Sequence, residues 1–509
     1  MKTLRDLKKL TTLLKEHQYL SSTISILSWD QECYMPSGGA EARANQLAYL
    51  MRLLHEKQVD DLMCEALSEC VELETGNLKG GAADWHPQAR GLLKEVWKDY
   101  HRAIKLPSDF IQKMGLVTSM AHQSWMTARE DNDFKKFSPH LKEIVSLKME
   151  EASYLGGGDS LYDPLLDTFE PGLTVAQITP IFSSLRARLV ELVQKITDSS
   201  ISPKKDFLHQ SFSSGKQLAF GIQVLEAMGY QFKNGRQDLA AHPFTTSFHP
   251  TDVRITTRID PCDIFSSLFS SIHEGGHALY DQGLPSKYFG TPLAEPVSHG
   301  IHESQSRLWE NCVGRSKPFW QHFYPILQKT FRSELEGIDL ETFYAATNSV
   351  VPSLIRVEAD EVTYNLHIML RFEIEKALIE EELAVEDLPA AWNEKMENYL
   401  DIIPESDTEG VLQDIHWASG AFGYFPSYTL GNLYAAQLFK QATKELPELT
   451  ANISEGKFHS LKHWLNEKIH RFGRTFRSDE LITQVTGEPL NPDYFNDYLE
   501  EKFGEIYSL

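Results

Sequence analysis

The chain has 509 residues, of which 41% are apolar and 11% aromatic, enough to bury a large hydrophobic core. Its 49 lysines and arginines against 72 aspartates and glutamates give a net charge of −23, which argues against nucleic acid or an anionic membrane as the main partner. The five cysteines are scattered and form no CxxC pair, so we expect free thiols and a reducing, cytoplasmic location.

The N-terminal stretch carries leucines at helical spacing, with charged residues between them. These leucines are Leu4, Leu7, Leu10, Leu13 and Leu14. The pattern predicts an amphipathic helix and not a signal peptide, whose apolar stretch would be unbroken. The chain has no run of about 18 apolar residues, so we expect no membrane span.

Most of the remaining chain repeats apolar residues every three or four positions, which predicts helices. The clearest such patterns lie at 141–154, 180–196, 340–350, 358–382 and 458–472. Residues 242–259 differ, because they are rich in Thr, Val, Ile and Phe and contain an alternating stretch, which predicts a small sheet. The Gly- and Pro-rich segments 80–87, 156–159 and 283–296 predict loops between helices.

Residues 271–280 contain the sequence His-Glu-Gly-Gly-His. His273 and His277 are one helical turn apart on the same face, so both imidazoles can reach one metal ion. Glu274 lies beside them. A metal lowers the pKa of a water molecule bound to it, and a neighbouring carboxylate can accept that proton, which is hydrolytic chemistry. Chance is the alternative, because the chain has 19 histidines.

Two features of this segment favour a metal-binding helix. Residues 263–272 are apolar at helical spacing, so the motif lies on a buried helix, where unpaired His and Glu side chains would be costly. Gly275 and Gly276 each lower helix stability by about 1 kcal/mol relative to Ala. A buried helix tolerates this when something must approach its backbone closely, and tight packing alone is the alternative.

A catalytic zinc site needs a third protein ligand and an open position. Glu303 follows a loop rich in Gly and Pro, which could bring a second helix alongside the first. Two other glutamates compete for the role: Glu295 lies in the loop before Pro296, and Glu310 lies two turns beyond Glu303. We predict that Glu303 completes the ligand set with His273 and His277.

These residues resemble the carboxypeptidase Taq family of metallocarboxypeptidases. His-Glu-Gly-Gly-His at 273–277 is followed by His-Glu-Ser-Gln-Ser at 302–306, as in that family. Three further motifs agree, namely DxRxT at 252–256, IRxxADE at 355–361 and GxxQDxHW at 410–417. With matching segments at 28–36, 242–244 and 422–426, the resemblance spans nearly the whole chain.

The resemblance implies an enzyme that releases single amino acids from peptide C-termini with broad specificity. It also implies one zinc ion, or sometimes cobalt, per subunit, and a homodimer that binds peptides with a free C-terminus. We expect a mainly α fold, with one large helical domain over 1–509, a deep central substrate groove and a small β-sheet beside the metal-binding helix. A helical part would cover about 1–240, and the metal- and substrate-binding part about 241–509.

The resemblance assigns Arg356 to the C-terminal carboxylate of the substrate. A planar guanidinium matches a carboxylate in bidentate fashion, which fits this role. A structural ion pair with Glu358, Asp360 or Glu361 is the alternative. We expect Asp360 and Glu361 to orient a metal ligand or Arg356 rather than to act in catalysis.

His416 and Tyr424 resemble the residues with which the family stabilises the transition state. A core histidine and an aromatic packing cluster are the simpler alternatives. Arg254, with Thr256, would line the groove and close its far end, which would favour exopeptidase action. A solvated strand residue is the alternative for Arg254.

Two other functions remain open. An oligopeptidase or dipeptidyl carboxypeptidase of a related helical fold shares HExxH and a downstream Glu, and the first products released from a peptide would distinguish it. A catalytically silent peptide-binding protein is the second. The intact set of His273, Glu274, His277 and Glu303 disfavours it, and a metal assay with a chelator would decide.

Overall fold

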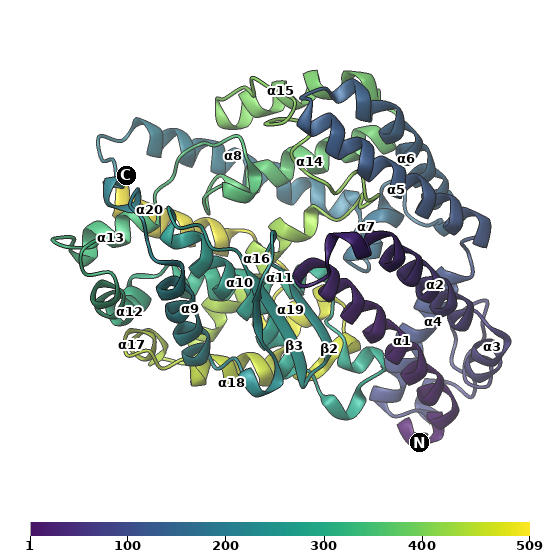
Figure 1. Ribbon diagram of the computed structural model, residues 1–509. Helices are drawn as coiled ribbons and strands as arrows, with labels where there is room; N and C mark the ends of the chain where they lie inside the picture. The colour runs from purple at the N-terminus through teal and green to yellow at the C-terminus, as the bar shows by residue number, and fades with distance from the viewer. Residues whose placement is uncertain (1) are drawn as a thin grey trace. The chain divides into compact units, whose positions relative to one another are not determined.

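The computed structural model describes residues 2–509 and is mainly helical with one small sheet, which confirms the predicted fold class (Figure 1). The chain forms two compact units. Unit 1 comprises Met1–Ile104, Lys204–Thr347 and Leu438–Pro489, and unit 2 comprises Lys105–Pro203, Asn348–Gln437 and Leu490–Leu509. The units differ from the two consecutive parts expected from the sequence, because the chain passes between them several times.

Unit 1 contains the sheet and the helices that carry the predicted metal ligands. Its α-helices are α1 (Lys8–Cys33), α2 (Ala40–Gln58), α3 (Asp61–Ser68), α4 (Pro87–Ala103), α9 (Ser214–Met228), α10 (Ile264–Gly283), α11 (His299–Arg307), α12 (Lys317–Thr330), α13 (Leu340–Thr347), α17 (Leu449–Ser454), α18 (His459–Lys468) and α19 (Ser478–Thr486).

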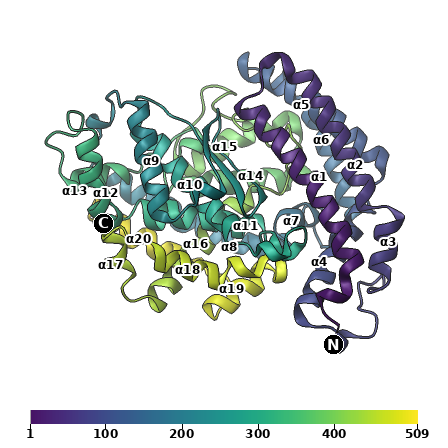
Figure 2. The ribbon, with the colours of Figure 1, turned by 60° about the horizontal axis from the view of Figure 1, so that its bottom comes forward.

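Unit 2 contains the remaining helices. They are α5 (Ser108–Glu130), α6 (Phe134–Leu155), α7 (Asp163–Phe169), α8 (Val175–Asp198), α14 (Tyr364–Ile379), α15 (Leu388–Leu400) and α20 (Asp493–Tyr507), while α16 (Pro426–Glu445) runs across the boundary at Gln437. Helices α5 and α6 lie side by side in this unit (Figure 2).

The N-terminal leucines form the buried face of a short 3-10 turn and of α1, which confirms the predicted amphipathic helix. Leu7 and Leu10 are buried in a cluster that includes Trp85, and the other predicted leucines pack at its edge. Helix α1 packs against α2 (Figure 2). Across residues 2–509, no helix is both long enough and apolar enough to cross a membrane, and the five cysteines are free.

The predicted helical patterns at 141–154 and 180–196 lie wholly within helices, whereas the other three extend past the ends of α13, α14 and α18. The pattern at 358–382 predicts a helix from its first residue, whereas α14 begins at Tyr364. The carboxylate of Asp360 accepts hydrogen bonds from the backbone N–H groups of Val362 and Thr363 (both 3.0 Å). This local cap holds the chain in a turn, so the helix starts only after it.

The sheet has three strands in the order β1-β3-β2. Strands β2 (Thr245–His249) and β3 (Asp252–Thr257) are antiparallel and lie in the stretch predicted to form a sheet. Strand β1 (Gln237–Leu239) is parallel to β3 and was not predicted, because its three residues are too few to show alternation. The sheet packs against α10 (Figure 1).

Gly275 and Gly276 allow two neighbouring helices of unit 1 to approach α10 closely. A Cβ atom on Gly276 would lie 2.6 Å from Cα of Ser306 and 2.7 Å from the backbone oxygen of Gln305, next to the C-terminal end of α11. A Cβ atom on Gly275 would lie 2.4 Å from the side chain of Leu225 on α9. Tight packing therefore accounts for both glycines, and Gly276 sets how closely α11 lies to α10.

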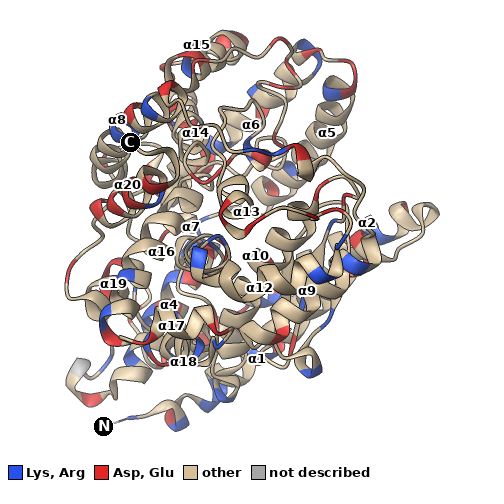
Figure 3. Ribbon diagram, turned by 90° about the vertical axis from the view of Figure 1, so that its left-hand side faces the viewer, with Lys and Arg blue, Asp and Glu red and all other residues tan. Residues whose placement is uncertain are grey.

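Acidic and basic residues are interspersed along the helices of both units (Figure 3). Several form ion pairs between segments that are distant in the sequence. In unit 1, Arg474 binds Glu295 (2.9 Å), Asp99 (2.8 Å) and Glu95 (3.3 Å). These ion pairs fix the loop that precedes α11 against α4.

Candidate active site

Helices α10 and α11 bring the three predicted metal ligands together. One nitrogen or oxygen atom from each of His273, His277 and Glu303 lies within 4.8 Å of the other two. The Nε2 atoms of His273 and His277 lie 3.6 and 3.3 Å from Oε2 of Glu303. Ligand atoms around a tetrahedral zinc ion, with bonds of about 2.0–2.1 Å, are about 3.3 Å apart. The donor set therefore fits an ion of this size, and three protein ligands leave a fourth coordination position.

The charges at the three side chains also favour a cation. Burial and the neighbouring His302 lower the pKa of His277 to about 3, so its imidazole is neutral and offers a lone pair. Burial lowers the pKa of His273, but the charges of Glu303 and Glu310 outweigh it, and the pKa lies above its usual value. The two carboxylates that favour a proton on His273 equally favour a metal ion.

Glu303 remains ionised although it is buried. Burial raises its pKa, but the charges of Arg307 and His273 outweigh this effect and hold the pKa of Glu303 well below its usual range. Nε of Arg307 donates a hydrogen bond to Oε1 of Glu303 (2.7 Å) from the next turn of α11. The other carboxylate oxygen, Oε2, faces the two histidines.

Glu310 contacts the predicted ligand His273 and is not part of the group formed by His273, His277 and Glu303. Its Oε2 atom lies 2.8 Å from Nδ1 of His273, so this contact fixes the imidazole with Nε2 toward Glu303. Glu310 lies in a π-helix (Leu308–Gly314) that directly follows α11, and such helices are frequent at functional sites. Glu295, the other competitor, is bound by Arg474 (2.9 Å). In the sequence, Glu310 lies two helical turns beyond Glu303. This spacing indicated that both side chains would lie on the same face of one helix.

His302 packs against His277, the second predicted histidine ligand. Its ring is stacked on that of His277, with 4.3 Å between centroids and an interplanar angle of 17°. Nε2 of His302 lies 3.2 Å from Oδ1 of Asp281 on α10, which holds the ring in place. This support for His277 could not be read from the sequence, because it depends on how the two helices cross.

Glu274 is buried on α10 beside the two histidines. The hydroxyl group of Thr245, on β2, donates a hydrogen bond to Oε2 of Glu274 (2.6 Å). Burial raises the pKa of Glu274 above its usual value. A carboxylate that is oriented in this way and has a raised pKa is suited to accept a proton from water. The sequence did not single out Thr245, because it precedes Glu274 by many residues.

Arg254, on β3, is held by a bidentate ion pair and by aromatic rings. Its Nε and Nη2 atoms donate to the carboxylate of Asp252 (2.9 and 3.0 Å). The guanidinium lies over the rings of Trp29 and Phe248, 4.4 and 4.9 Å from their centroids. Arg254 is therefore not a solvated strand residue, and its role in closing a groove stays a prediction.

Arg356 lies in a 3-10 turn of unit 2 (Arg356–Glu358) and is buried. Its Nε and Nη2 atoms donate to Oδ1 of Asp414 (3.1 and 2.7 Å), and Nη1 donates to the hydroxyl of Tyr364 (3.0 Å). The acidic neighbours considered in the sequence are not its partners. Nε of Arg371, on α14, donates to the other oxygen of Asp414 (2.6 Å). Two guanidinium groups thus share one carboxylate.

This cluster of Arg356, Asp414 and Arg371 carries a net positive charge. Burial raises the pKa of Asp414, but both arginines outweigh it and hold the carboxyl ionised. Burial lowers the pKa of Arg371 to about 10, and Asp414 keeps the pKa of Arg356 above its usual value despite burial, so both remain charged at neutral pH. A buried excess of one positive charge favours the binding of an anionic group.

Asp360 and Glu361 do not take the orienting role expected of them. Besides capping α14, Asp360 accepts a hydrogen bond from the backbone N–H of Val351 (3.1 Å). Glu361 forms a buried ion pair with Lys502 on α20 (2.6 Å). The prediction that they orient a metal ligand or Arg356 directly is therefore wrong. Both instead fix the backbone of the segment in which Arg356 lies.

His416 and Tyr424 lie together in the irregular segment between α15 and α16. Their rings are stacked, with centroids 5.6 Å apart, and Nε2 of His416 lies 3.3 Å from the hydroxyl of Tyr428. Burial lowers the pKa of His416 to about 4, so its ring is neutral at pH 7. The ring of Phe169 contacts Tyr424 edge-on at 5.1 Å. Both residues are therefore part of one aromatic cluster in unit 2.

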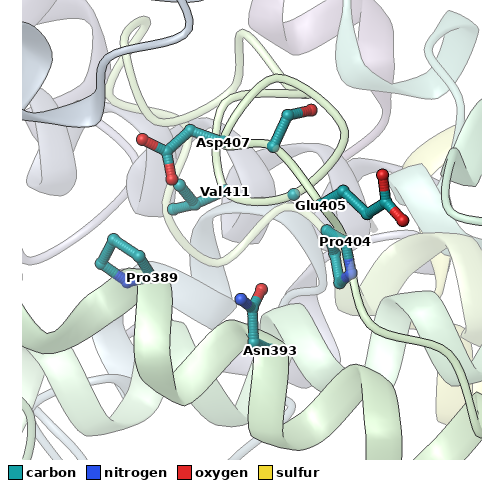
Figure 4. A pocket seen from close by; sticks show the side chains of 8 residues that line it. Pro389, Asn393, Pro404, Glu405, Asp407 and Val411 are labelled. Carbon is teal, nitrogen blue, oxygen red and sulfur yellow. The ribbon is translucent and has the colours of Figure 1, made fainter.

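A small polar pocket lies where this irregular segment begins (Figure 4). Pro389 and Asn393 of α15 form one side, and the chain from Pro404 to Val411 forms the other. The carboxylate of Asp407 accepts a hydrogen bond from the backbone N–H of Phe134 (3.0 Å). The residues that line this pocket are distinct from the predicted site residues.

Comparisons with known proteins agree with the motifs. Residues 9–503 match the sequence profile described as carboxypeptidase Taq (M32) metallopeptidase. Carboxypeptidase 1 of Bacillus subtilis is 39% identical over 502 residues, which cover 99% of each chain. Thermostable carboxypeptidase 1 of Thermus thermophilus is 42% identical over 504 residues, 97% of each chain. The crystal structure of an M32 carboxypeptidase from Deinococcus radiodurans is similar, with a TM-score of 0.94, 37% identity and 99% of each chain covered.

Proposed function

The chain belongs to the carboxypeptidase Taq (M32) family of metallopeptidases, and we propose that it releases single amino acids from peptide C-termini with broad specificity. The proposed metal is one zinc ion per subunit, with cobalt as a second candidate, held by His273, His277 and Glu303. The spacing of these three donor groups carries the proposal. A zinc ion bound there would supply Lewis acidity, which polarises a carbonyl group and makes water more acidic.

Glu274 is the proposed general base. It accepts a proton from the attacking water molecule and then donates it to the leaving amine. The hydrogen bond from Thr245 (2.6 Å) keeps the carboxylate in one orientation, and burial raises its pKa, which allows it to hold the proton between the two transfers. A correctly placed acid or base contributes about 10²- to 10⁴-fold to the rate.

Arg356 is the proposed binding group for the C-terminal carboxylate of the substrate. The net positive charge that it shares with Arg371 and Asp414 supports this role, because an arriving carboxylate would neutralise it. Arg254 is proposed to restrict the substrate to its C-terminal end, held in place by Asp252.

His416 and Tyr424 are proposed to donate hydrogen bonds to the oxygen atom that becomes negative in the transition state. A preorganised donor of this kind contributes about 3 to 4 kcal/mol. Burial lowers the pKa of His416 to about 4, so at neutral pH its ring holds one N–H proton. The proposal also includes a homodimer and a cytoplasmic location, which light scattering and cell fractionation would test.

Mass spectrometry of peptide cleavage over time tests the function directly. A peptide with a free C-terminus should lose one residue at a time, the chelated enzyme should be inactive, and added zinc should restore the activity. Dipeptides or internal fragments as first products would instead support a dipeptidyl carboxypeptidase or an oligopeptidase. Equal cleavage of C-terminally amidated peptides would contradict the role of Arg356.

A further inference from the structure

We infer that Glu375 is a positioning residue for the reaction, because its carboxylate holds the loop that carries His416 and Tyr424. The inference rests on the proposed function, which gives those two residues their roles in the transition state. Glu375 lies on α14 in unit 2, and its side chain is fully buried. It would act through the loop and not by touching the substrate.

One carboxylate binds the loop at two points, each adjacent to a proposed catalytic residue. Oε1 of Glu375 accepts a hydrogen bond from Nε1 of Trp417 (2.9 Å), the residue after His416. Oε2 accepts a hydrogen bond from the backbone N–H of Gly423 (2.9 Å), the residue before Tyr424. Both donors are buried, so each needs a partner inside the protein.

The loop depends on such contacts, because residues 401–425 form neither a helix nor a strand. Gly423 has a φ angle of +92°, and a Cβ atom there would lie 2.5 Å from the backbone oxygen of Leu165. The backbone before Tyr424 is therefore pressed against α7 on one side and bound to Glu375. Tyr424 therefore follows a turn whose backbone is held in place, although the segment is irregular.

Among the hydrogen bonds of the described residues, the Glu375 carboxylate accepts from three donors, none of which is a lysine or arginine. The third donor is the hydroxyl of Tyr162, 2.5 Å from Oε2. Lys148 on α6 is the cation whose charge acts on Glu375, and it forms its own ion pair with Glu151 (2.5 Å). An ionised carboxylate accepts hydrogen bonds only, so it satisfies all three donors at once.

A glutamine at this position would keep the size of the side chain but not its hydrogen bonds. Its amide has one acceptor oxygen and one NH₂ group, which only donates. In either orientation the NH₂ group faces a group that only donates, Nε1 of Trp417 or the N–H of Gly423. Glu375→Gln therefore loosens the loop on one side without leaving a cavity.

Protonation of Glu375 weakens the same contacts. Burial raises the pKa of Glu375 to about 7, although hydrogen bonds from Tyr162, Gly423 and Trp417 and the charge of Lys148 act in the opposite direction. The protonated acid accepts less strongly and has a proton of its own to donate. The loop should therefore loosen as the pH falls through about 7, and the environment of Trp417 should change with it.

The experiment compares Glu375→Gln with Glu373→Gln on the same helix. Glu373 binds Lys395 and Tyr399 and serves as the matched carboxylate outside the loop. We expect kcat of Glu375→Gln to fall about 10- to 100-fold, as for a misplaced catalytic group, with KM within about threefold. Metal content and circular dichroism should match the parent protein, and Glu373→Gln should keep the parent kcat.

Tryptophan fluorescence provides a readout that does not depend on catalysis. The parent protein should show a change in emission with a midpoint near pH 7, and this change should be absent from both Glu375→Gln and Trp417→Phe. A pH-dependent change that persists in Glu375→Gln would overturn the inference. So would a parent-like kcat in Glu375→Gln, or an equal loss in Glu373→Gln.

Failure of this inference can be told apart from failure of the proposed function. Release of free amino acids by the parent enzyme tests the function alone, whatever the ratio between variant and parent. His416→Ala and Tyr424→Phe test whether the loop residues act in the reaction. If both keep the parent kcat, Glu375 has nothing to position and the inference fails, while the carboxypeptidase activity stands.

Discussion

The contact between Glu274 and Thr245 offers the most direct test of the proposed general base. Glu274→Gln should retain the metal, because the three ligands are unchanged, but lose about 10²- to 10⁴-fold in kcat, since an amide cannot accept the proton. Metal analysis of the purified variant and initial rates on a short peptide measure the two effects.

The variant Thr245→Val provides a graded comparison for Glu274→Gln. This substitution removes the hydroxyl that donates to the carboxylate of Glu274. The value of kcat should therefore fall only about fivefold to tenfold, the equivalent of one hydrogen bond of about 1 kcal/mol. Turnover by Glu274→Gln close to that of the parent would rule out the general-base role.

We expect Glu310 to affect zinc binding at the proposed site through its contact with His273. Glu310→Gln should lower zinc affinity about 10- to 100-fold, because the contact with Nδ1 loses its charge. Competition with a chromogenic chelator measures the affinity. Glu295→Gln is the matched control, since its partner is Arg474 and not a ligand, and its zinc affinity should equal that of the parent. An equal loss in the two variants would contradict the role of Glu310.

Some of these side chains could be identified from the sequence and others could not. His273, His277 and Glu274 follow from helical periodicity, since residues one turn apart share a face. Glu303 followed from the expectation of a second helix. The pairing of Arg356 with Asp414 was out of reach, because the two lie in different motifs and meet only through the packing of unit 2. The acidic residues closest to Arg356 in the sequence were the wrong candidates.

Gly276 on α10 determines how closely α11, the helix that carries the proposed ligand Glu303, approaches. Gly276→Ala should destabilise the protein by about 1–3 kcal/mol, the usual effect of overpacking, because the added methyl group meets the backbone around Ser306. It should also weaken zinc binding, since α11 carries Glu303. Thermal unfolding of the metal-free protein and a zinc titration measure the two effects.

Gly275→Ala is the control for Gly276→Ala. It adds a methyl group to the same helix without changing the contact between α10 and α11. Its added carbon meets the tips of the Leu225 and Met228 side chains on α9 and none of the nearest atoms belongs to α11. Zinc affinity should therefore stay close to that of the parent. If Gly275→Ala weakened zinc binding as much as Gly276→Ala, the spacing of α10 and α11 would not be the cause.

The secondary structure was predictable where a pattern is long and regular. Helices α6 and α8 contain the periodic segments expected of them, and β2 and β3 lie in the alternating stretch. The start of α14 was misplaced because one capping carboxylate, that of Asp360, overrides the periodicity. The π-helix after α11 could not be predicted from the sequence, because the spacing of its apolar residues is close to that of an α-helix.

Unit 1 provides all three proposed metal ligands, so metal binding should stabilise the folded protein. At a zinc concentration about 100 times the dissociation constant, the gain is about 2.7 kcal/mol. The melting temperature of the parent should fall on chelation and recover with zinc. That of Glu303→Gln should respond far less, and an equal response in this variant would show that zinc stabilises the protein elsewhere.

The interleaving of the two units has a consequence for synthesis on the ribosome. Unit 1 includes Leu438–Pro489 and unit 2 includes Leu490–Leu509, so neither can complete its core until the final segments have emerged. The helices with the histidine motif therefore leave the exit tunnel long before their last neighbours exist. Contacts so distant along the chain favour slow folding. Nascent chains that stop before the final segment should be bound by chaperones and cut by proteases.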